Sequence, residues 1–118
     1  MIETKRYDLE ERTYRFAKGV AFFCKKLSHK LPDIAYITQV IKASSSVGAN
    51  YIEANEALSK KDFIMRIKIC RKEAKESVYW LRLINDTNSA DFVQEGLTLQ
   101  EEAIELKKIF SSIIAKMY

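Results

Sequence analysis

The stretch from Asp33 to Leu58, DIAYITQVIKASSSVGANYIEANEAL, decides how this chain folds, because its middle can be interpreted in two ways. Ala43–Asn50 is rich in Ser, Gly and Asn, which are poor helix formers, so a loop could split the segment. Alternatively, the run is a helix kept narrow so that another backbone can approach. A helical stripe continues through the run without losing phase, in Ile34, Ile37, Ile41, Ser44, Val47, Gly48, Tyr51, Ala54 and Leu58. Because a loop would not need to keep this phase, the pattern favours one continuous helix over 34–58.

Upstream of this segment the pattern predicts a first helix over 9–31. Asp8 is a suitable N-cap residue, and Glu11 occupies the capping-box position three residues later. Pro32 would end the helix, since proline disfavours helical geometry in the residue before it.

Downstream, two more helices are expected. Ser59, with Asp62 in the capping-box position, predicts a helix over 60–85. The last helix, over 90–117, has two possible starts: Ser89 could cap a long helix, or Thr98 could begin a shorter one.

Composition supports an all-α fold. The chain has 118 residues, 47% apolar and 31% charged, with only three Gly and one Pro, which argues against turn-rich β folds. This length suits one domain over 1–118. Short connections make sequential helices antiparallel, so we expect an up-down-up-down four-helix bundle.

The two cysteines, Cys24 and Cys70, are too few for a disulfide framework or a zinc site. Each lies within an apolar helical pattern, as expected of a small buried side chain in a reducing compartment. The N-terminal residues lack the apolar core of a signal peptide, and no apolar run approaches the ~20 residues of a membrane span. These features predict a cytoplasmic protein with no membrane association.

Positive charge is concentrated in the third predicted helix. The formal net charge is +4, but residues 60–85 alone carry eight Lys and Arg against three Asp and Glu, whereas residues 86–118 carry three against six. Helical spacing places one stripe on a single face, in Lys61, Met65, Lys68, Lys72, Lys75, Tyr79 and Arg82. Five cations could contact phosphates and the tyrosine could stack on a base. The alternative is an ordinary solvated helix face.

A second polar group is expected between the second and third helices. Counting outward from Ser59 pairs Glu53 with Arg66, Ser46 with Glu73, and Lys42 with Glu76. Gln39 and Asn50 extend the same face of the second helix. Because unpaired buried charges are costly, we interpret these eight residues as a hydrogen-bonded network that fixes helix register or a subunit contact.

No motif points to catalysis or to a cofactor. A di-iron bundle needs Glu-x-x-His pairs on two helices, and the only histidine, His29, belongs to no such motif. The sequence also lacks a Ser-His-Asp set and a Gly-rich phosphate loop. We therefore expect a protein that is not an enzyme and that binds no metal or cofactor.

The run from Gln39 to Ala54 resembles the signature of the bacterial four-helix bundle proteins encoded in intervening sequences of 23S ribosomal RNA genes. The resemblance continues in SKKDFI (59–64) and EAKESVYWL (73–81), and it covers about residues 8–117. Two positions depart from the family pattern: Lys42 stands where Arg is usual, and Tyr51 follows Asn50 where Ile is frequent. Lys keeps the charge but loses the bidentate geometry of Arg, so a carboxylate pairing at this position would be weaker.

The resemblance implies an antiparallel bundle with the small-residue run inside the second helix. It further implies a homopentameric ring, as in the related accessory variability protein of diversity-generating retroelements, which is basic and works with a reverse transcriptase and RNA. The exposed aromatics expected at Phe22, Tyr36 and Trp80 would then be covered by neighbouring copies.

Two functions remain in competition. The first is a non-enzymatic, ring-forming protein whose basic face binds structured RNA or an RNA–protein complex. The second is a structural oligomer that binds a protein partner and no nucleic acid.

Overall fold

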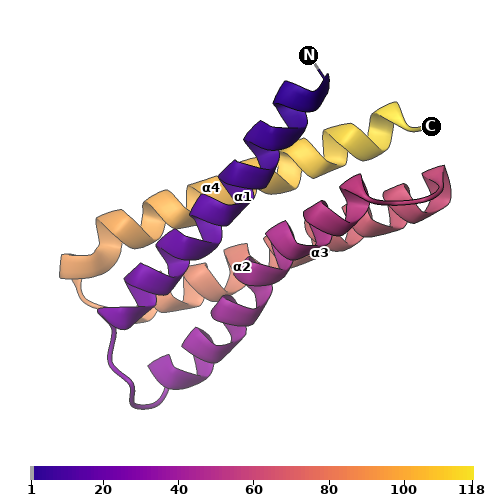
Figure 1. Ribbon diagram of the computed structural model, residues 1–118. Helices are drawn as coiled ribbons and strands as arrows, with labels where there is room; N and C mark the ends of the chain where they lie inside the picture. Colours follow the sequence, from indigo (N-terminus) through magenta and orange to yellow (C-terminus); the bar gives the residue numbers. More distant parts are fainter. Residues whose placement is uncertain (1) are drawn as a thin grey trace.

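The computed structural model describes the backbone of residues 2–118 and the side chains of residues 8–89, 91–92 and 94–118. Within this part the chain forms four helices and no strand: α1 (Ile2–Lys25), α2 (Asp33–Asn55), α3 (Lys60–Thr87) and α4 (Ala90–Lys116). Consecutive helices run in opposite directions, and both the beginning of α1 and the C-terminus lie at the end of the bundle where α2 turns into α3 (Figure 1). The all-α antiparallel bundle is therefore confirmed.

The small-residue run lies inside one uninterrupted helix. Residues 33–55 are helical throughout, so the continuous-helix prediction is confirmed and the loop alternative is wrong. Ser44 is buried, and a Cβ added at Gly48 would lie 3.0 Å from Thr13 Oγ1 and 3.6 Å from the Thr13 carbonyl carbon. The narrow middle of α2 thus lets the backbone of α1 approach closely.

The core is formed by the inward stripes of all four helices. Its largest fully buried side chains come from α1, α3 and α4, and Tyr51 of α2 packs against Phe110 of α4 with ring centroids 6.1 Å apart. The Cys70 thiol donates a hydrogen bond to the Val47 carbonyl (3.4 Å), which places α2 directly against α3.

The predicted bounds of the first helix are wrong at both ends. Helix α1 already includes Asp8, which therefore lies inside the helix and does not cap it. The helix ends at Lys25, because the chain turns there to bury Leu27 in the core, and the following residues, from Ser28 to Leu31, are exposed and cannot hold another turn against it. Pro32 occupies the N-cap position of α2.

The other bounds lie closer to prediction. Helix α2 ends at Asn55, three residues before Leu58, whose side chain is 97% exposed and has no core to pack against. The Ser59 cap is confirmed, since its hydroxyl oxygen accepts a hydrogen bond from the Asp62 amide (3.0 Å). Helix α4 takes the longer of the two predicted forms, directly after Ser89, although the Ser89 side chain makes no capping bond.

Charged groups tie α1 to α4, which is the least extensively packed of the adjacent helix pairs. The Arg12 guanidinium donates two hydrogen bonds to the Glu102 carboxylate (2.7 and 2.8 Å), and this pairing raises the pKa of Arg12. Beyond the end of α1, Lys26 Nζ lies 2.7 Å from Glu95 Oε2. A bidentate Arg–carboxylate pair fixes geometry better than a single contact, so Arg12 sets the position of α1 on α4.

Candidate functional site

The predicted basic stripe lies on the solvent face of α3. All six of its predicted nucleic-acid contacts are exposed, namely Lys61, Lys68, Lys72, Lys75, Tyr79 and Arg82. Buried residues such as Ile67, Cys70 and Leu81 occupy the opposite side of the helix. The structure thus brings the six side chains together on one face, about 32 Å long at 1.5 Å per residue.

Carboxylates neutralise this face only weakly. Lys72 Nζ lies 3.9 Å from Glu73 Oε2, and Arg82 Nε lies 4.0 Å from Asp86 Oδ2. Both pairs are long and the cation in each is exposed, so the pairs contribute little and both cations remain available to a ligand. Lys61 and Lys75 make no ion pair within the described part of the chain.

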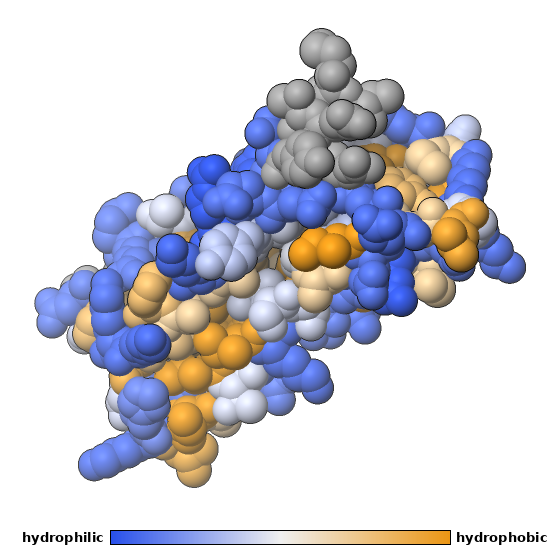
Figure 2. All heavy atoms as spheres, viewed as in Figure 1, coloured by the Kyte–Doolittle hydropathy of each residue, from blue (hydrophilic) through white to orange (hydrophobic). Residues whose placement is uncertain are grey.

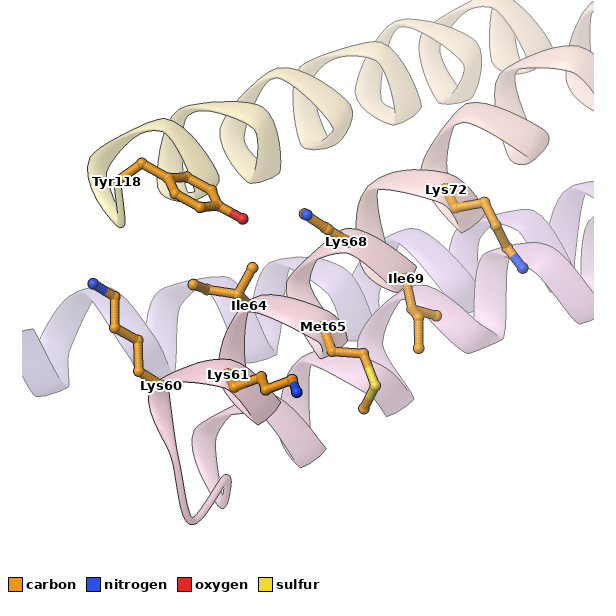
Figure 3. Close-up of a pocket in the computed structure, with 8 residues that line it drawn as sticks. All are labelled: Lys60, Lys61, Ile64, Met65, Lys68, Ile69, Lys72 and Tyr118. Carbon is orange, nitrogen blue, oxygen red and sulfur yellow. The ribbon is translucent and has the colours of Figure 1, made fainter.

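The first half of the stripe borders a groove of about 830 Å³. Its floor is apolar, formed by Ile64, Met65 and Ile69, and lysines stand along its rim (Figure 3). The Tyr118 ring lies across from Ile64 with its hydroxyl directed toward Lys68, whose Nζ is 5.7 Å from the ring centroid. An anionic ligand with flat or apolar groups fits such a lining.

The second half of the stripe borders a separate hollow of about 530 Å³, to which α2 also contributes. The hollow is lined by Gln39, Lys72, Lys75, Glu76, Tyr79 and Trp80. The Tyr79 ring is 57% exposed and meets the Trp80 ring edge-on, with centroids 5.0 Å apart. Trp80 is held in turn by Tyr36 at 6.2 Å.

Sequence reasoning missed part of this surface. Tyr118 reaches the groove only because α4 returns along α3, a tertiary proximity that no local pattern reveals. Trp80 and Tyr36 were expected to be exposed, but both are half-buried against the edge of the core, whereas Phe22 is 51% exposed as expected. Lys60 also lines the rim of the groove, although it was not among the predicted contacts.

The three predicted pairs between α2 and α3 form no hydrogen bond or ion pair in the described part of the chain. Arg66 donates a hydrogen bond to Asn50 Oδ1 (3.0 Å) and makes no ion pair with Glu53, and the Ser46 hydroxyl donates to the Lys42 carbonyl. The register is displaced by about one helical turn, because the connection is centred between Asn55 and Lys60 rather than at Ser59.

The same group is also less internal than predicted. Gln39, Lys42, Glu53 and Glu76 are exposed, and Ser46, Asn50, Arg66 and Glu73 are half-buried. These eight residues therefore form a polar border along the outer edge of the α2–α3 pair, next to the basic stripe, and not a network enclosed by the bundle.

Glu73 is the residue of this border whose negative charge is destabilised by its surroundings. Its side chain is 17% exposed, and burial is the main cause that raises its pKa. The neighbouring Glu76 raises the pKa further, while Lys72 and Lys42 lower it. The negative charge on Glu73 is thus incompletely compensated.

A third face, on α2, carries no charge over several turns. Its exposed residues share one line along the helix, at Thr38, Ile41, Ser45, Ala49 and Ile52. Ile52 is 50% exposed and Ile41 36%. Apolar side chains also break the hydrophilic surface at the lower left of Figure 2, where Figure 1 places the beginning of α2. Such a strip permits close packing of another helix.

The cysteines are structural. Both are free and buried, and burial raises the pKa of Cys24 to about 11 and that of Cys70 to about 12. Because the thiolate is the reactive form, neither thiol is activated at neutral pH. Within the described residues no three His, Cys, Asp or Glu side chains gather closely enough to hold a metal ion.

A comparison with protein families identifies the family of this chain. The model of the 23S rRNA-intervening sequence protein matches residues 5–112. The chain belongs to this family. A solved structure of a protein of unknown function from the S23 ribosomal protein family of Bacteroides thetaiotaomicron VPI-5482 is similar, with 29% identity and a TM-score of 0.78 over 89% of this chain and 96% of that chain. A comparison with curated proteins gave no match.

None of the helices in the described part of the chain combines the length and the apolarity that crossing a bilayer requires.

Proposed function

We propose that this chain is a non-catalytic, ring-forming member of its family that binds structured RNA or an RNA–protein complex through the basic face of α3. The observation that carries the proposal is the exposure of all six stripe residues on one side of the most basic helix. Residues 60–85 hold eight cations against three anions, and the exposed cations are only loosely paired. Phosphate backbones bind such surfaces by releasing their counterions.

The experiment is a salt titration of binding to a fluorescent RNA fragment. If five cations each neutralise one phosphate of a single-stranded segment, the logarithm of the binding constant falls against the logarithm of salt concentration with a slope of about −3.5. The triple variant Lys68→Glu, Lys72→Glu, Lys75→Glu should abolish binding at low salt with unchanged helicity. If this variant bound the RNA as tightly as the wild type, the proposal would be contradicted.

A matched control keeps the charge change constant and moves it to another surface. Lys18→Glu, Lys25→Glu, Lys30→Glu alters three exposed lysines on α1 and the turn that follows it, away from α3. This variant should retain most of the affinity, because only the general attraction of the molecule is reduced. A loss as large as that of the α3 variant would mean that net charge, and not the α3 face, drives binding.

The ring belongs to the same proposal. The uncharged strip on α2 supports self-association, because the small side chains of Ser45 and Ala49 lie between the exposed Ile41 and Ile52. Repetition of the basic stripe by symmetry would multiply a modest charge of +4 per chain. We propose a homopentamer.

The uncharged α2 strip also favours the second candidate, a structural oligomer or protein scaffold that binds no nucleic acid. Under this candidate the wild-type protein would show no salt-dependent retention on any RNA. The titration described above therefore separates the two candidates with the same samples.

A further inference from the structure

We infer that the hollow at Gln39, Glu76 and Tyr79 is a binding site for one unpaired base, with preference for a base that presents an amino group. This inference rests on the proposed RNA-binding function and deepens it: the stripe would hold single-stranded segments of an RNA, such as loops or ends, in addition to contacting phosphates.

The stacking surface is pre-oriented. Tyr79 is 57% exposed, yet its ring is positioned edge-on by Trp80 at 5.0 Å, and Trp80 is itself packed on the core and on Tyr36. A ring held in this way loses little conformational freedom when a base stacks on it. Bases within a duplex are already stacked on their neighbours and cannot use it, which favours unpaired nucleotides.

Two groups in the same hollow can hydrogen-bond the edge of that base. Gln39 of α2 offers an amide, and Glu76 of α3 offers a carboxylate that only accepts hydrogen bonds. Neither side chain makes a hydrogen bond or an ion pair within the described part of the chain. A carboxylate accepts from the exocyclic amino group of cytosine, whereas uracil presents an oxygen at the same position and would be repelled.

Cations flank the hollow where the sugar–phosphate backbone would pass. Lys72 and Lys75 line it directly, and Lys72 also borders the groove beneath Tyr118, so the two cavities adjoin along α3. The hollow combines a stacking ring, an acceptor for a base edge and cations for phosphate. The Glu76 carboxylate would repel a phosphate group, but it can accept a hydrogen bond from the amino group of a base and so select that base.

The test compares two RNA strands that differ only at the recognised position of the pyrimidine ring. Oligocytidine and oligouridine of equal length carry equal charge, so salt-dependent attraction is the same for both. The wild-type protein should bind oligocytidine about fivefold to tenfold more tightly. Glu76→Gln should reduce this preference to about onefold, since an amide can donate to uracil as well as accept from cytosine.

Stacking is tested separately with a conservative control. Tyr79→Ala should weaken binding of both single strands about tenfold or more, while Tyr79→Phe should bind like the wild type because the ring is kept. An RNA duplex of the same length should bind Tyr79→Ala and wild type alike.

The outcomes separate the inference from the proposal on which it rests. No binding of any RNA by the wild type overturns both. A second result would overturn the base site alone. In it, the triple lysine variant loses RNA binding, but the wild type binds the two pyrimidine strands equally and Glu76→Gln has no effect. The RNA-binding face of α3 would then still be supported. Equal loss of duplex and single-strand binding in Tyr79→Ala would likewise overturn the base site.

Discussion

Gly96 and Asn85 meet where α3 packs on α4, and this contact leaves no room for a side chain. A Cβ at Gly96 would overlap the Asn85 side-chain oxygen and lie 2.9 Å from Phe23 Cζ. Gly96→Ala should therefore lower the free energy of unfolding by roughly 1–3 kcal/mol despite its better helix propensity. Urea unfolding followed by circular dichroism measures the change.

Gly19→Ala is the matched control for this substitution. Its added Cβ would meet only Leu99 Cδ2, at 3.1 Å, the end of a flexible side chain. The control should be neutral or stabilising by up to about 1 kcal/mol. The stability lost through Gly96→Ala should be smaller in an Asn85→Ala background, because the overlapping oxygen is then gone. Equal losses in the two backgrounds would show that the Gly96–Asn85 contact is not the cause.

Glu73 gives a pH-dependent prediction. Burial raises its pKa in the folded protein, so the folded state binds more protons than the unfolded state in the carboxyl range. Stability attributable to Glu73 therefore falls as pH rises through that range. Glu73→Gln should raise the melting temperature near pH 7 and lose this advantage near pH 4, whereas the exposed Glu56→Gln should change little at either pH. A constant difference across pH would rule out the titration.

The local sequence pattern predicts the exposure of some side chains, but it does not predict the contacts that others make. The exposure of the lysines on α3 follows from helical spacing alone, because a 3.6-residue period places them opposite the core. The partners of Arg66 do not follow from helical spacing. The predicted end of α2 was three residues too late, and this difference moves every contact between α2 and α3 by about one turn. Tyr118 and Gln39 join the site only through packing between helices.

At the scale of single helices, N-capping offers a comparison within one chain. Ser59 caps α3 with a hydrogen bond from the Asp62 amide, whereas Ser89 occupies the same position before α4 without one. Ser59→Ala should cost about 1 kcal/mol of stability, and Ser89→Ala much less. Equal losses in denaturant titrations would show that the Ser59 bond contributes nothing.

Helix identity was predictable from sequence, but helix ends were less so. The unbroken phase of the stripe in α2 predicted a continuous helix against its poor propensity, because packing on Thr13 and α3 outweighs intrinsic preference. The end of α1 was not predictable from the Pro32 signal. It depends on Leu27 turning into the core, a long-range contact that no local stop signal encodes.

For the whole molecule, charge is segregated among surfaces. The α3 face is cationic, residues 86–118 carry an excess of acids, and the α2 strip from Thr38 to Ile52 carries no charge. A free bundle gains nothing from keeping Ile41 and Ile52 in water, whereas an assembly would cover them and leave α3 open to RNA. The segregation therefore connects the proposed ring with the proposed binding face.

This connection makes assembly testable by a single substitution. Ile52→Glu places a charge in the middle of a face that self-association would bury, and burying an unpaired charge is costly. Light scattering of the wild type should give about five times the 13.7 kDa chain mass at micromolar concentration, and Ile52→Glu should give the mass of one chain. Leu97→Glu, at a comparably exposed position on α4, should leave the assembly intact. A monomeric wild-type protein would contradict the proposed ring. If Leu97→Glu dissociated the assembly and Ile52→Glu did not, the interface would lie on α4 and not on α2.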